Sequence, residues 1–437
     1  MCRWKRIIPP LLALLSFLPG GCGNDQDAAE AGTTIEVWAH AGQESERRTL
    51  EDQVARFNAK HEGRLRVDLT LIPEGSYNEQ VQAAAVAGEL PDLLEFDGPF
   101  VAAYAWQGRL RTLERLLPQA LIDDLLPSIL AQGRYQGRLW ALGSFDSGLG
   151  LYADRRRLKQ VGARIPSLQR PWSLAEFDAL LGRLAAQDPD GQVLDLKLNY
   201  AGEWYTYAFS PLLQSAGGDL IDRKAQRAGG TLDGPASVSA VQDLQRWIEA
   251  GLVDPNIDDA AFTGGRVALA LGGHWNYPAY RKALGDNLLL LPLPDLGKGP
   301  RSGQGSWCWA VTGDSDHPQQ AAAFLRFLLQ PEEVLAMSRA NGAVPASRQA
   351  IARSLRFRKG GALHLFVEQL QGGFSVPRPR SPAYPVITAE FQKAVDRIRA
   401  GGPVQAALSA AARAIDLEIA DNHGYPLVGR AKAEVER

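Results

Sequence analysis

Aromatic and acidic residues stand together where apolar segments of this sequence end. Trp38 and His40 close a short β-rich run, with Glu44 just beyond, and Asp97 follows another apolar run. A sugar presents flat apolar C–H faces and a rim of hydroxyl groups, so aromatic rings suit the faces and carboxylates suit the rim. If these side chains converge, the chemistry that they favour is noncovalent binding of a sugar.

Three further segments carry candidate aromatic residues. Trp275 and Asn276 follow two glycines at the end of an apolar strand pattern, and Trp275 is the best candidate for a ligand platform. Trp307 and Trp309 share one face of a predicted strand, so we expect at least one of these two rings in a core. Every such ring has packing within the fold as its alternative role. A stretch without clean periodicity adds four residues: Glu203, Trp204, Tyr205 and Tyr207.

Motifs of covalent catalysis are missing from the sequence, which has no GxSxG, HExxH, Walker A or paired CxxC pattern. The six His residues show no metal-ligand spacing. We therefore predict no catalytic residue, no metal site and no cofactor. A carboxylate pair such as Asp146 and Glu203 keeps a secreted carbohydrate-active enzyme open as an alternative.

Strand and helix patterns alternate along the first part of the chain. Residues 35–39, 65–71 and 92–96 have strand patterns, and residues 45–61 and 77–87 have helical spacing. This order is typical of a doubly wound α/β sheet. Because ligands bind beyond the carboxyl ends of the strands in such sheets, the strand-end residues are expected at one crevice.

The second part of the chain repeats this alternation. A segment of small residues at 142–148 suits a connection between two lobes, and Ser173 with Glu176 forms a capping box at a helix start. Residues 266–271 have a strand pattern, and residues 404–421 repeat apolar residues at helical spacing. A chain of 437 residues is too long for one compact core, so two lobes are expected.

The N-terminal residues have the pattern of an export signal. Basic residues precede the apolar residues 7–18, a run shorter than the roughly 20 residues that a membrane-spanning helix needs. Residues 1–21 are therefore predicted to be a signal peptide and residues 22–33 a tether. Cys22 follows two small residues, as in the lipobox of bacterial lipoproteins, although Pro19 stands where that motif usually has Leu. We expect lipidation of Cys22 and an extracytoplasmic location on the periplasmic side of the cytoplasmic membrane.

The charge balance and the cysteines exclude some classes of protein. Lys and Arg number 47 against 49 Asp and Glu, which gives no long-range attraction to nucleic acid. Without the signal peptide, Cys22 and Cys308 are the remaining cysteines, so a disulfide framework is excluded. Cys308 is expected to be a buried thiol.

Three motifs in order carry a family resemblance. Residues 87–94 (AGELPDLL) are similar to an AxGxxPDV stretch, residues 135–142 (YQGRLWAL) to a YxGKxYGLP stretch, and residues 262–275 to an FxxGxxAMxxxGxW segment. The chain from about residue 34 to its last predicted helix thus resembles the extracellular solute-binding proteins of the carbohydrate-uptake ABC family, relatives of maltose-binding protein.

The resemblance implies a periplasmic-binding-protein-like α/β fold, in which three crossings join two α/β lobes around a ligand cleft. Lobe one would comprise residues 34–142 and 295–354, and lobe two residues 143–294 and 355–437. His40 matches no fixed position of the family. The residues carried over to the ligand site are Trp38, Glu44, Asp97, Glu203, Tyr205 and Trp275, with Arg378 after the third crossing.

The implied function is the capture of a sugar or small oligosaccharide by hinge closure and its delivery to the permease subunits of an ABC importer. Such a protein would act as a monomer and without covalent chemistry. Glycerol-phosphate, a polyamine and iron stay open as alternative ligands of the same fold.

Overall fold

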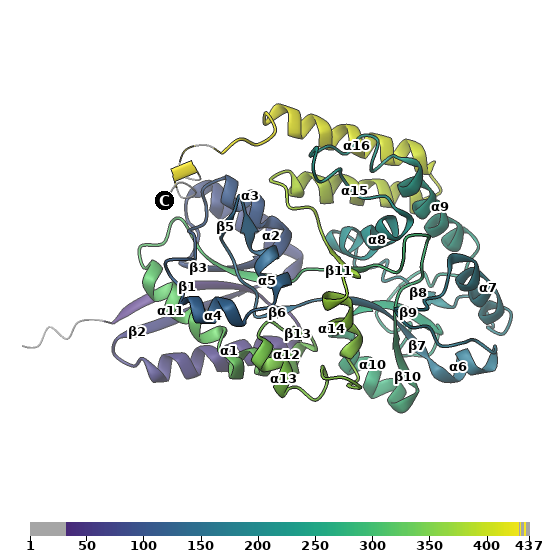
Figure 1. Cartoon of the computed structure of the whole chain (residues 1–437), viewed down its shortest axis with the longest axis horizontal. Helices are drawn as coiled ribbons and strands as arrows, with labels where there is room; N and C mark the ends of the chain where they lie inside the picture. Colours follow the sequence, from purple (N-terminus) through teal and green to yellow (C-terminus); the bar gives the residue numbers. More distant parts are fainter. Residues whose placement is uncertain (1–31, 428, 430–431, 434–437) are drawn as a thin grey trace, which may run out of the picture.

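The computed structural model describes residues 32–427, 429 and 432–433 of the chain (Figure 1). The predicted signal peptide, Cys22 and most of the predicted tether lie outside these residues. Over the described ranges, no helix combines the length and the apolar character needed to cross a membrane.

The sheet of lobe one has four strands in the order β12-β3-β1-β2. β1 (Thr33–His40), β2 (Leu65–Ile72) and β3 (Leu93–Asp97) are parallel, whereas β12 (Trp307–Val311) pairs antiparallel with β3. The strands predicted at 35–39, 65–71 and 92–96 are therefore confirmed. The register pairs Trp307 with Asp97 at the carboxyl end of β3, which brings two candidate ligand residues to one edge of the sheet.

Helices cover both faces of this sheet. Ile35 and Val37 belong to an apolar cluster that includes residues of α1 (Glu44–Lys60) and α11 (Pro318–Leu328). Trp38 packs against the cluster on the other face, with residues of α2 (Glu74–Ala87) and α3 (Val101–Trp106). This division follows from the strand itself, because successive side chains of a strand point to opposite faces.

Shorter elements complete this lobe. They are η1 (Gly98–Phe100), α4 (Gln119–Asp124), α5 (Pro127–Gln132), β4 (Arg134–Tyr135), β5 (Arg138–Leu139), α12 (Pro331–Asn341), β13 (Val344–Pro345), α13 (Arg348–Arg353) and α14 (His364–Gln371).

The sheet of lobe two has the order β10-β7-β9-β8. β7 (Leu149–Asp154) pairs antiparallel with β9 (Leu269–Gly273) and with β10 (Leu288–Leu291), and β8 (Leu194–Asp195) pairs parallel with β9. All residues of β9 are buried, which explains the continuous apolar run in its sequence.

Helices surround this second sheet, and α8, α15 and α16 lie on one side of it (Figure 1). The predicted capping box is present at the start of α7, where Ser173 and Glu176 bond to each other's backbone N–H groups. The helices are α6 (Arg155–Gln160), α7 (Leu174–Ala185), α8 (Glu203–Ala216), α9 (Pro235–Glu249), η2 (His274–Asn276), α10 (Tyr277–Leu284), η3 (Gly285–Asn287), α15 (Tyr384–Arg399) and α16 (Val404–Asp421).

Short strands run between the two lobes. β6 (Phe145–Asp146) pairs with β13, and β11 (Ser302–Gln304) pairs in parallel with β14 (Ser375–Pro377). Figure 1 shows β6 and β11 in the middle of the molecule, between the two sheets. We propose that β6, β11 and β14 are the crossings of the hinge.

Two boundaries in this arrangement differ from those expected from the sequence. Phe357 and Phe366 lie in the apolar cluster of lobe one, although residues from 355 onward were expected in lobe two. Leu296 packs against the cluster of lobe two, and the Lys298 backbone N–H donates to the carbonyl of Ser215 in α8, although lobe one was expected to resume at 295. The apolar pattern of a segment shows that it has a buried face, but not which lobe that face contacts.

Candidate functional site

Arg378 joins the two lobes at their junction. Its Nη1 and Nη2 donate hydrogen bonds of 2.6 and 2.7 Å to the two carboxylate oxygens of Asp97, at the end of β3. Nη1 also donates to Oε1 of Glu203, the first residue of α8, at 2.6 Å. The structure therefore brings three sequence-predicted site residues into direct contact, and the pairing with Asp97 is bidentate.

Glu203 also accepts hydrogen bonds from two hydroxyl groups of α15. Tyr384 Oη donates to Oε1, and Thr388 Oγ1 donates to Oε2 at 2.7 Å. Burial raises the pKa of Glu203, and the Arg378 charge opposes this rise. Tyr384 and Thr388 were not identified from the sequence, because only the packing of α15 on α8 brings them to this carboxylate.

The ring of Tyr207 packs against the same guanidinium. The Cζ atom of Arg378 lies 4.8 Å from the ring centre, which is a cation–π contact. Tyr207 is buried, and burial raises the pKa of its hydroxyl. Tyr207 follows Glu203 by four residues, so the two side chains share one face of α8. This spacing was a signal in the sequence that marked Tyr207 as a site residue.

Tyr205, the tyrosine predicted for the site, lies elsewhere. It is fully buried, its ring stacks on Phe209, and its hydroxyl donates to the Leu198 carbonyl at 3.0 Å and accepts from Arg399. A helix has about 3.6 residues per turn, so two residues after Glu203 the side chain points to the opposite face. We therefore replace Tyr205 by Tyr207 in the candidate set.

Asp146 is a wholly buried carboxylate in β6. Its Oδ1 accepts from the Ser147 backbone N–H at 2.9 Å, and the Ser128 hydroxyl and the Gly305 backbone lie beside the carboxylate. Burial raises the pKa of Asp146 to about 6, although the Ser128 hydroxyl and two backbone groups lower it.

A second chain of polar contacts crosses the junction. The Asn341 side chain donates to Oε1 of Glu46 at 3.0 Å, and its backbone carbonyl lies 2.7 Å from Nδ1 of His274. Nε2 of His274 lies 2.9 Å from the Ser147 hydroxyl. Burial lowers the pKa of His274 to about 4, so the ring is neutral at physiological pH. Since Nδ1 faces a carbonyl, it carries the proton, and Nε2 accepts from Ser147.

Glu46, not the predicted Glu44, is the carboxylate of α1 at this junction. Glu44 is exposed and pairs with Arg48 on the surface of the helix. Glu46 lies 3.9 Å from Nε2 of His40, and burial raises its pKa. The sequence shows both acidic residues at the start of the helix, but the orientation of its first turn decides which one faces inward.

His40 and Trp307 form a stacked pair. Their ring centres are 3.7 Å apart and the planes differ by 4°. Nδ1 of His40 lies 2.8 Å from Oε2 of Glu95. Trp309 is buried in the core of lobe one, as expected for one of the two tryptophans, and Trp38 is half-buried against α2 and α3.

The aromatic residues of lobe two form a group around Trp275. This half-buried ring lies 6.1 Å from Trp204, 6.2 Å from Tyr207 and 5.0 Å from His274, measured between ring centres. Trp204 is buried, and its indole N–H donates to the Leu196 carbonyl at 3.0 Å, so it supports the group from the core. Asn276 caps η2 by accepting from the Gly273 N–H at 3.1 Å. Its contact is therefore local.

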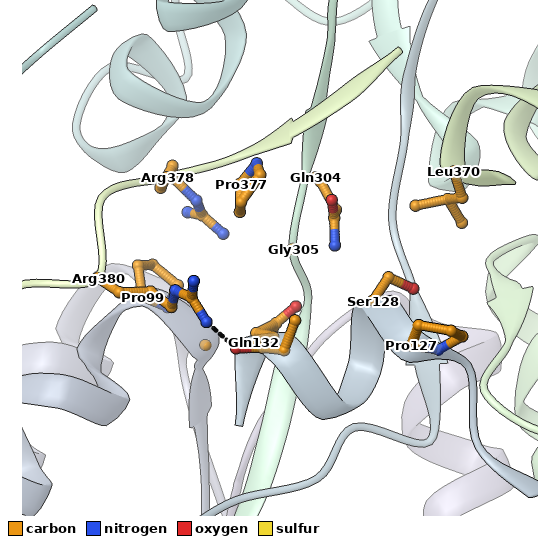
Figure 2. A pocket seen from close by; sticks show the side chains of 12 residues that line it. Pro99, Pro127, Ser128, Gln132, Gln304, Gly305, Leu370, Pro377, Arg378 and Arg380 are labelled. Carbon is orange, nitrogen blue, oxygen red and sulfur yellow. Dashed lines mark hydrogen bonds between the residues drawn. The ribbon is translucent and has the colours of Figure 1, made fainter. Parts of the chain in front are cut away.

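A cavity of about 330 Å³ adjoins Arg378 (Figure 2). It lies between α5 and the segments that contain β11 and β14, and Arg380 on its wall donates to the Ala131 carbonyl at 2.7 Å. Gly305 has a φ of 123°, and a Cβ there would lie 3.1 Å from Nη2 of Arg378, so the close approach of this segment requires glycine. The lining residues are Gly98, Pro99, Pro127, Ser128, Ala131, Gln132, Gln304, Gly305, Leu370, Pro377, Arg378 and Arg380.

Metal binding has no support in the described ranges, because no three His, Cys, Asp or Glu side chains there are grouped to hold an ion. Cys308 is a free, buried cysteine, as expected, and burial raises the pKa of its thiol. The arrangement is thus one of hydrogen-bond acceptors, one guanidinium and aromatic rings, drawn from both lobes.

Comparison with curated proteins and solved structures gives the relatives of this chain. An uncharacterized lipoprotein in the oleD 5′ region of Streptomyces antibioticus is 25% identical over 351 residues, which are 78% of this chain and 76% of that protein. The GacH receptor of Streptomyces glaucescens, solved unliganded and with acarbose, superposes with a TM-score of 0.76 at 22% identity over 89% of this chain and 100% of that chain. The maltose/maltodextrin-binding domain MalE from Bdellovibrio bacteriovorus, bound to maltotriose, has a TM-score of 0.75 at 19% identity over the same shares of the two chains.

These structures share the two-lobed α/β fold, and the fold expected from the sequence is confirmed. The sequence profile of bacterial extracellular solute-binding proteins matches residues 52–356, which is more than half of the chain. The chain therefore belongs to the family of bacterial extracellular solute-binding proteins, as its ordered motifs predicted.

Proposed function

We propose that this protein captures a sugar or small oligosaccharide outside the cytoplasm and delivers it to the permease of an ABC importer. The observation that carries the proposal is the junction of the two lobes. Carboxylates from β3 and α8 meet there on Arg378, the Asp146 carboxylate of β6 lies near Tyr207, and the rings of Trp275 and Trp307 belong to the same region. Acceptors for hydroxyl groups and rings for C–H faces are the two kinds of contact that a sugar needs.

A buried hydroxyl group without a partner supports a polar ligand in particular. The hydroxyl of Ser306 is buried and has no hydrogen-bond partner among the described residues. Native proteins leave few such groups unsatisfied, because each costs free energy. A polyhydroxylated ligand supplies donors and acceptors to groups of this kind.

Hinge closure explains how capture is coupled to delivery. A ligand that contacts Asp97 in lobe one and Glu203 in lobe two binds the closed state better than the open state, and so shifts the population toward closure. The three short crossings, β6, β11 and β14, are the segments that absorb the motion in this proposal. The permease would then recognise the closed form.

The relatives favour a sugar over the other solutes considered. The GacH receptor was solved with acarbose and the Bdellovibrio domain with maltotriose. Both the family and these neighbours are binding proteins, so we propose that the chain has no catalytic activity. The lipoprotein relative supports lipidation of Cys22 as the membrane anchor. We further propose that the protein acts as a monomer.

A thermal-shift screen followed by calorimetry tests the proposed function. Purified protein without its first 21 residues is titrated with a panel of neutral and aminated oligosaccharides, and with glycerol 3-phosphate, spermidine and ferric citrate. A sugar that raises the melting temperature and is recovered uncleaved supports the proposal. Stabilisation by a non-sugar alone, or the appearance of cleaved glycan, would refute it.

A further inference from the structure

The C-terminal segment, residues 422–427, leaves the last helix of lobe two and contacts lobe one. The indole N–H of Trp106, the last residue of α3, donates to the Pro426 carbonyl at 2.7 Å. The rings of Trp106 and Tyr425 meet edge to face, with their centres 4.9 Å apart. Leu427 packs against the apolar cluster that contains residues of α2 and α3. The end of the chain therefore joins α16 to the surface of the other lobe.

Hydrogen bonds to one carboxylate hold the C-terminal segment on α16. The Tyr425 hydroxyl and the Asn422 side-chain amide each donate to Oε1 of Glu418 at 2.9 Å. The Asn422 amide also donates to the Glu418 backbone carbonyl at 3.0 Å. Tyr425 is buried and belongs to the apolar cluster of lobe two. Since the segment is attached to lobe two in this way, its bond and ring contact with Trp106 are contacts between the lobes.

A sharp turn of the backbone directs the C-terminal segment out of the helix. His423, Gly424 and Tyr425 have φ values of 52°, 74° and 60°. These values lie in the left-handed region, which a bulky residue adopts only where its surroundings hold it there. Tyr425 is held by Glu418 on one side and by Trp106 on the other. The conformation of the turn is therefore set by contacts in both lobes.

A cavity of about 510 Å³ lies between the lobes beside this contact. Its walls come from α2 and α3 on one side and from α15 and α16 on the other, and Trp106, Asn422 and Tyr425 are among its lining residues. The lobes are thus not packed continuously along this edge, and the C-terminal segment bridges them there.

The bridge is separate from the hinge crossings. Figure 1 shows the C-terminal end of the chain beside α3, away from β6 and β11 in the middle of the molecule. Opening about those crossings carries α3 away from α16, so Trp106 must release the Pro426 carbonyl and the Tyr425 ring before the lobes separate. A hydrogen bond and an edge-to-face ring pair both stabilise the state that contains them. The closed state has both contacts and the open state has neither.

Resting on the hinge closure of the proposed function, we infer that residues 422–427 are a latch that holds the two lobes closed. Arg378 links the lobes within the junction, and the latch links them at the outer edge, through Trp106. The latch favours the closed state and slows opening, so that a captured solute is retained. Its loss shifts the population of the protein toward the open state.

Spin labels on the two lobes measure this shift without any solute. The labels are attached at Gln80→Cys in α2 and Arg413→Cys in α16, two exposed positions, in a protein that also carries Cys22→Ser. A chain that ends at Asp421 lacks the latch, and a chain that ends at Gly429 keeps it and is the matched control. We expect the ratio of open to closed protein to rise at least about fivefold in the chain that ends at Asp421, which is about 1 kcal/mol, and to stay unchanged in the control.

Point variants decide the question if the shortened chain does not fold. Trp106→Phe removes the donor to the Pro426 carbonyl and keeps an aromatic ring, whereas Tyr425→Ala removes the ring and the bond to Glu418. Both should raise the open fraction, and Tyr425→Ala should raise it more. Trp172→Phe, at a buried tryptophan within lobe two, is the control and should leave the distance between the labels unchanged. Circular dichroism checks that each variant is folded.

The latch and the proposed function can fail separately. A longer distance between the labels in the latch variants supports the latch even if no sugar raises the melting temperature in the thermal-shift screen. The same distances in the parent and in the folded chain that ends at Asp421 overturn the latch, whatever sugar binds. Unchanged distances in both Trp106→Phe and Tyr425→Ala overturn it as well when the shortened chain is unfolded.

Discussion

Both terminal nitrogens of Arg378 donate to the two carboxylate oxygens of Asp97, at 2.6 and 2.7 Å, across 281 positions of sequence. Asp97 ends a strand of lobe one, and Arg378 directly follows β14. The pair therefore holds the end of β14 against one lobe, and the bond from Arg378 to Glu203 reaches the other lobe. This one guanidinium thus links the two lobes.

Removal of Arg378 tests this link. Arg378→Ala leaves two mostly buried carboxylates without their cation, and loss of one partner of a buried pair typically costs about 3–5 kcal/mol. We expect a lower free energy of unfolding in urea and a larger radius of gyration in small-angle scattering, because the lobes separate. Arg246→Ala, at an exposed pair, is the control and should cost less than about 1 kcal/mol. A compact, equally stable Arg378→Ala protein would contradict this account.

Tyr207 and Tyr205 provide a matched pair of tyrosines on one helix. Tyr207→Ala should weaken binding of the cognate sugar by more than about 1 kcal/mol, since its ring lies at the junction. Tyr205→Phe should leave the dissociation constant unchanged and lower the free energy of unfolding, because its hydroxyl bonds within lobe two. Calorimetric titration and urea unfolding of both variants separate the two effects. If Tyr205→Phe weakened sugar binding and Tyr207→Ala did not, Tyr205 would belong to the site in place of Tyr207.

Trp275 is expected to contribute to binding through its half-exposed ring. Trp275→Ala should weaken sugar binding by more than about 1 kcal/mol while the protein remains folded, because Trp204 and the core beneath it are unchanged. Intrinsic fluorescence during titration gives a second readout, since the ring would lose contact with water in the complex. Unchanged affinity in a folded variant would remove Trp275 from the site.

Asp146 makes the stability of the ligand-free protein depend on pH. Its pKa is raised by burial from 3.8 to about 6, so between these values the folded state binds more protons than the unfolded state. The contribution of Asp146 to stability therefore falls as pH rises from about 4 to 6, by on the order of 2–3 kcal/mol. Asp146→Asn should gain stability relative to the parent over this window and keep that gain above it. Thermal unfolding across pH checks the slope, and a constant difference between the two proteins would contradict it.

His274 should make the stability of the protein change with pH in the opposite direction to Asp146. Burial lowers its pKa from 6.5 to about 4, so the unfolded state binds more protons within this window, and stability falls as pH decreases from about 6.5 to 4. In the parent protein the two slopes oppose each other. His274→Gln, which keeps a side-chain amide near Ser147, should unmask the decline with rising pH that Asp146 causes. Identical pH profiles for the parent and His274→Gln would show that the ring is not buried neutral.

Local features of the chain could be predicted from the sequence because they depend on near neighbours. A β-rich run, an alternation of apolar residues and a compact apolar run predicted β1, β2 and β3 respectively, and Ser173 with Glu176 predicted the start of α7. The same local patterns indicated an acidic and aromatic ligand site, and the ordered motifs indicated the family. Asp97, Glu203 and Arg378 were all among the predicted site residues, and the structure brings them together.

Tertiary packing alone decided which neighbours face the junction. Glu46 faces it in place of Glu44, and Tyr207 in place of Tyr205, because the orientation of a helix about its axis is set by the surfaces on which it packs. Tertiary packing also decides that Phe366 of α14 is buried in lobe one. The burial of Asp146 is also a property of the fold, since a carboxylate becomes wholly buried only when distant segments close around it. The sequence by itself thus determined the elements, the family and the types of residue at the site, whereas nonlocal contacts decided their partners and their charge balance.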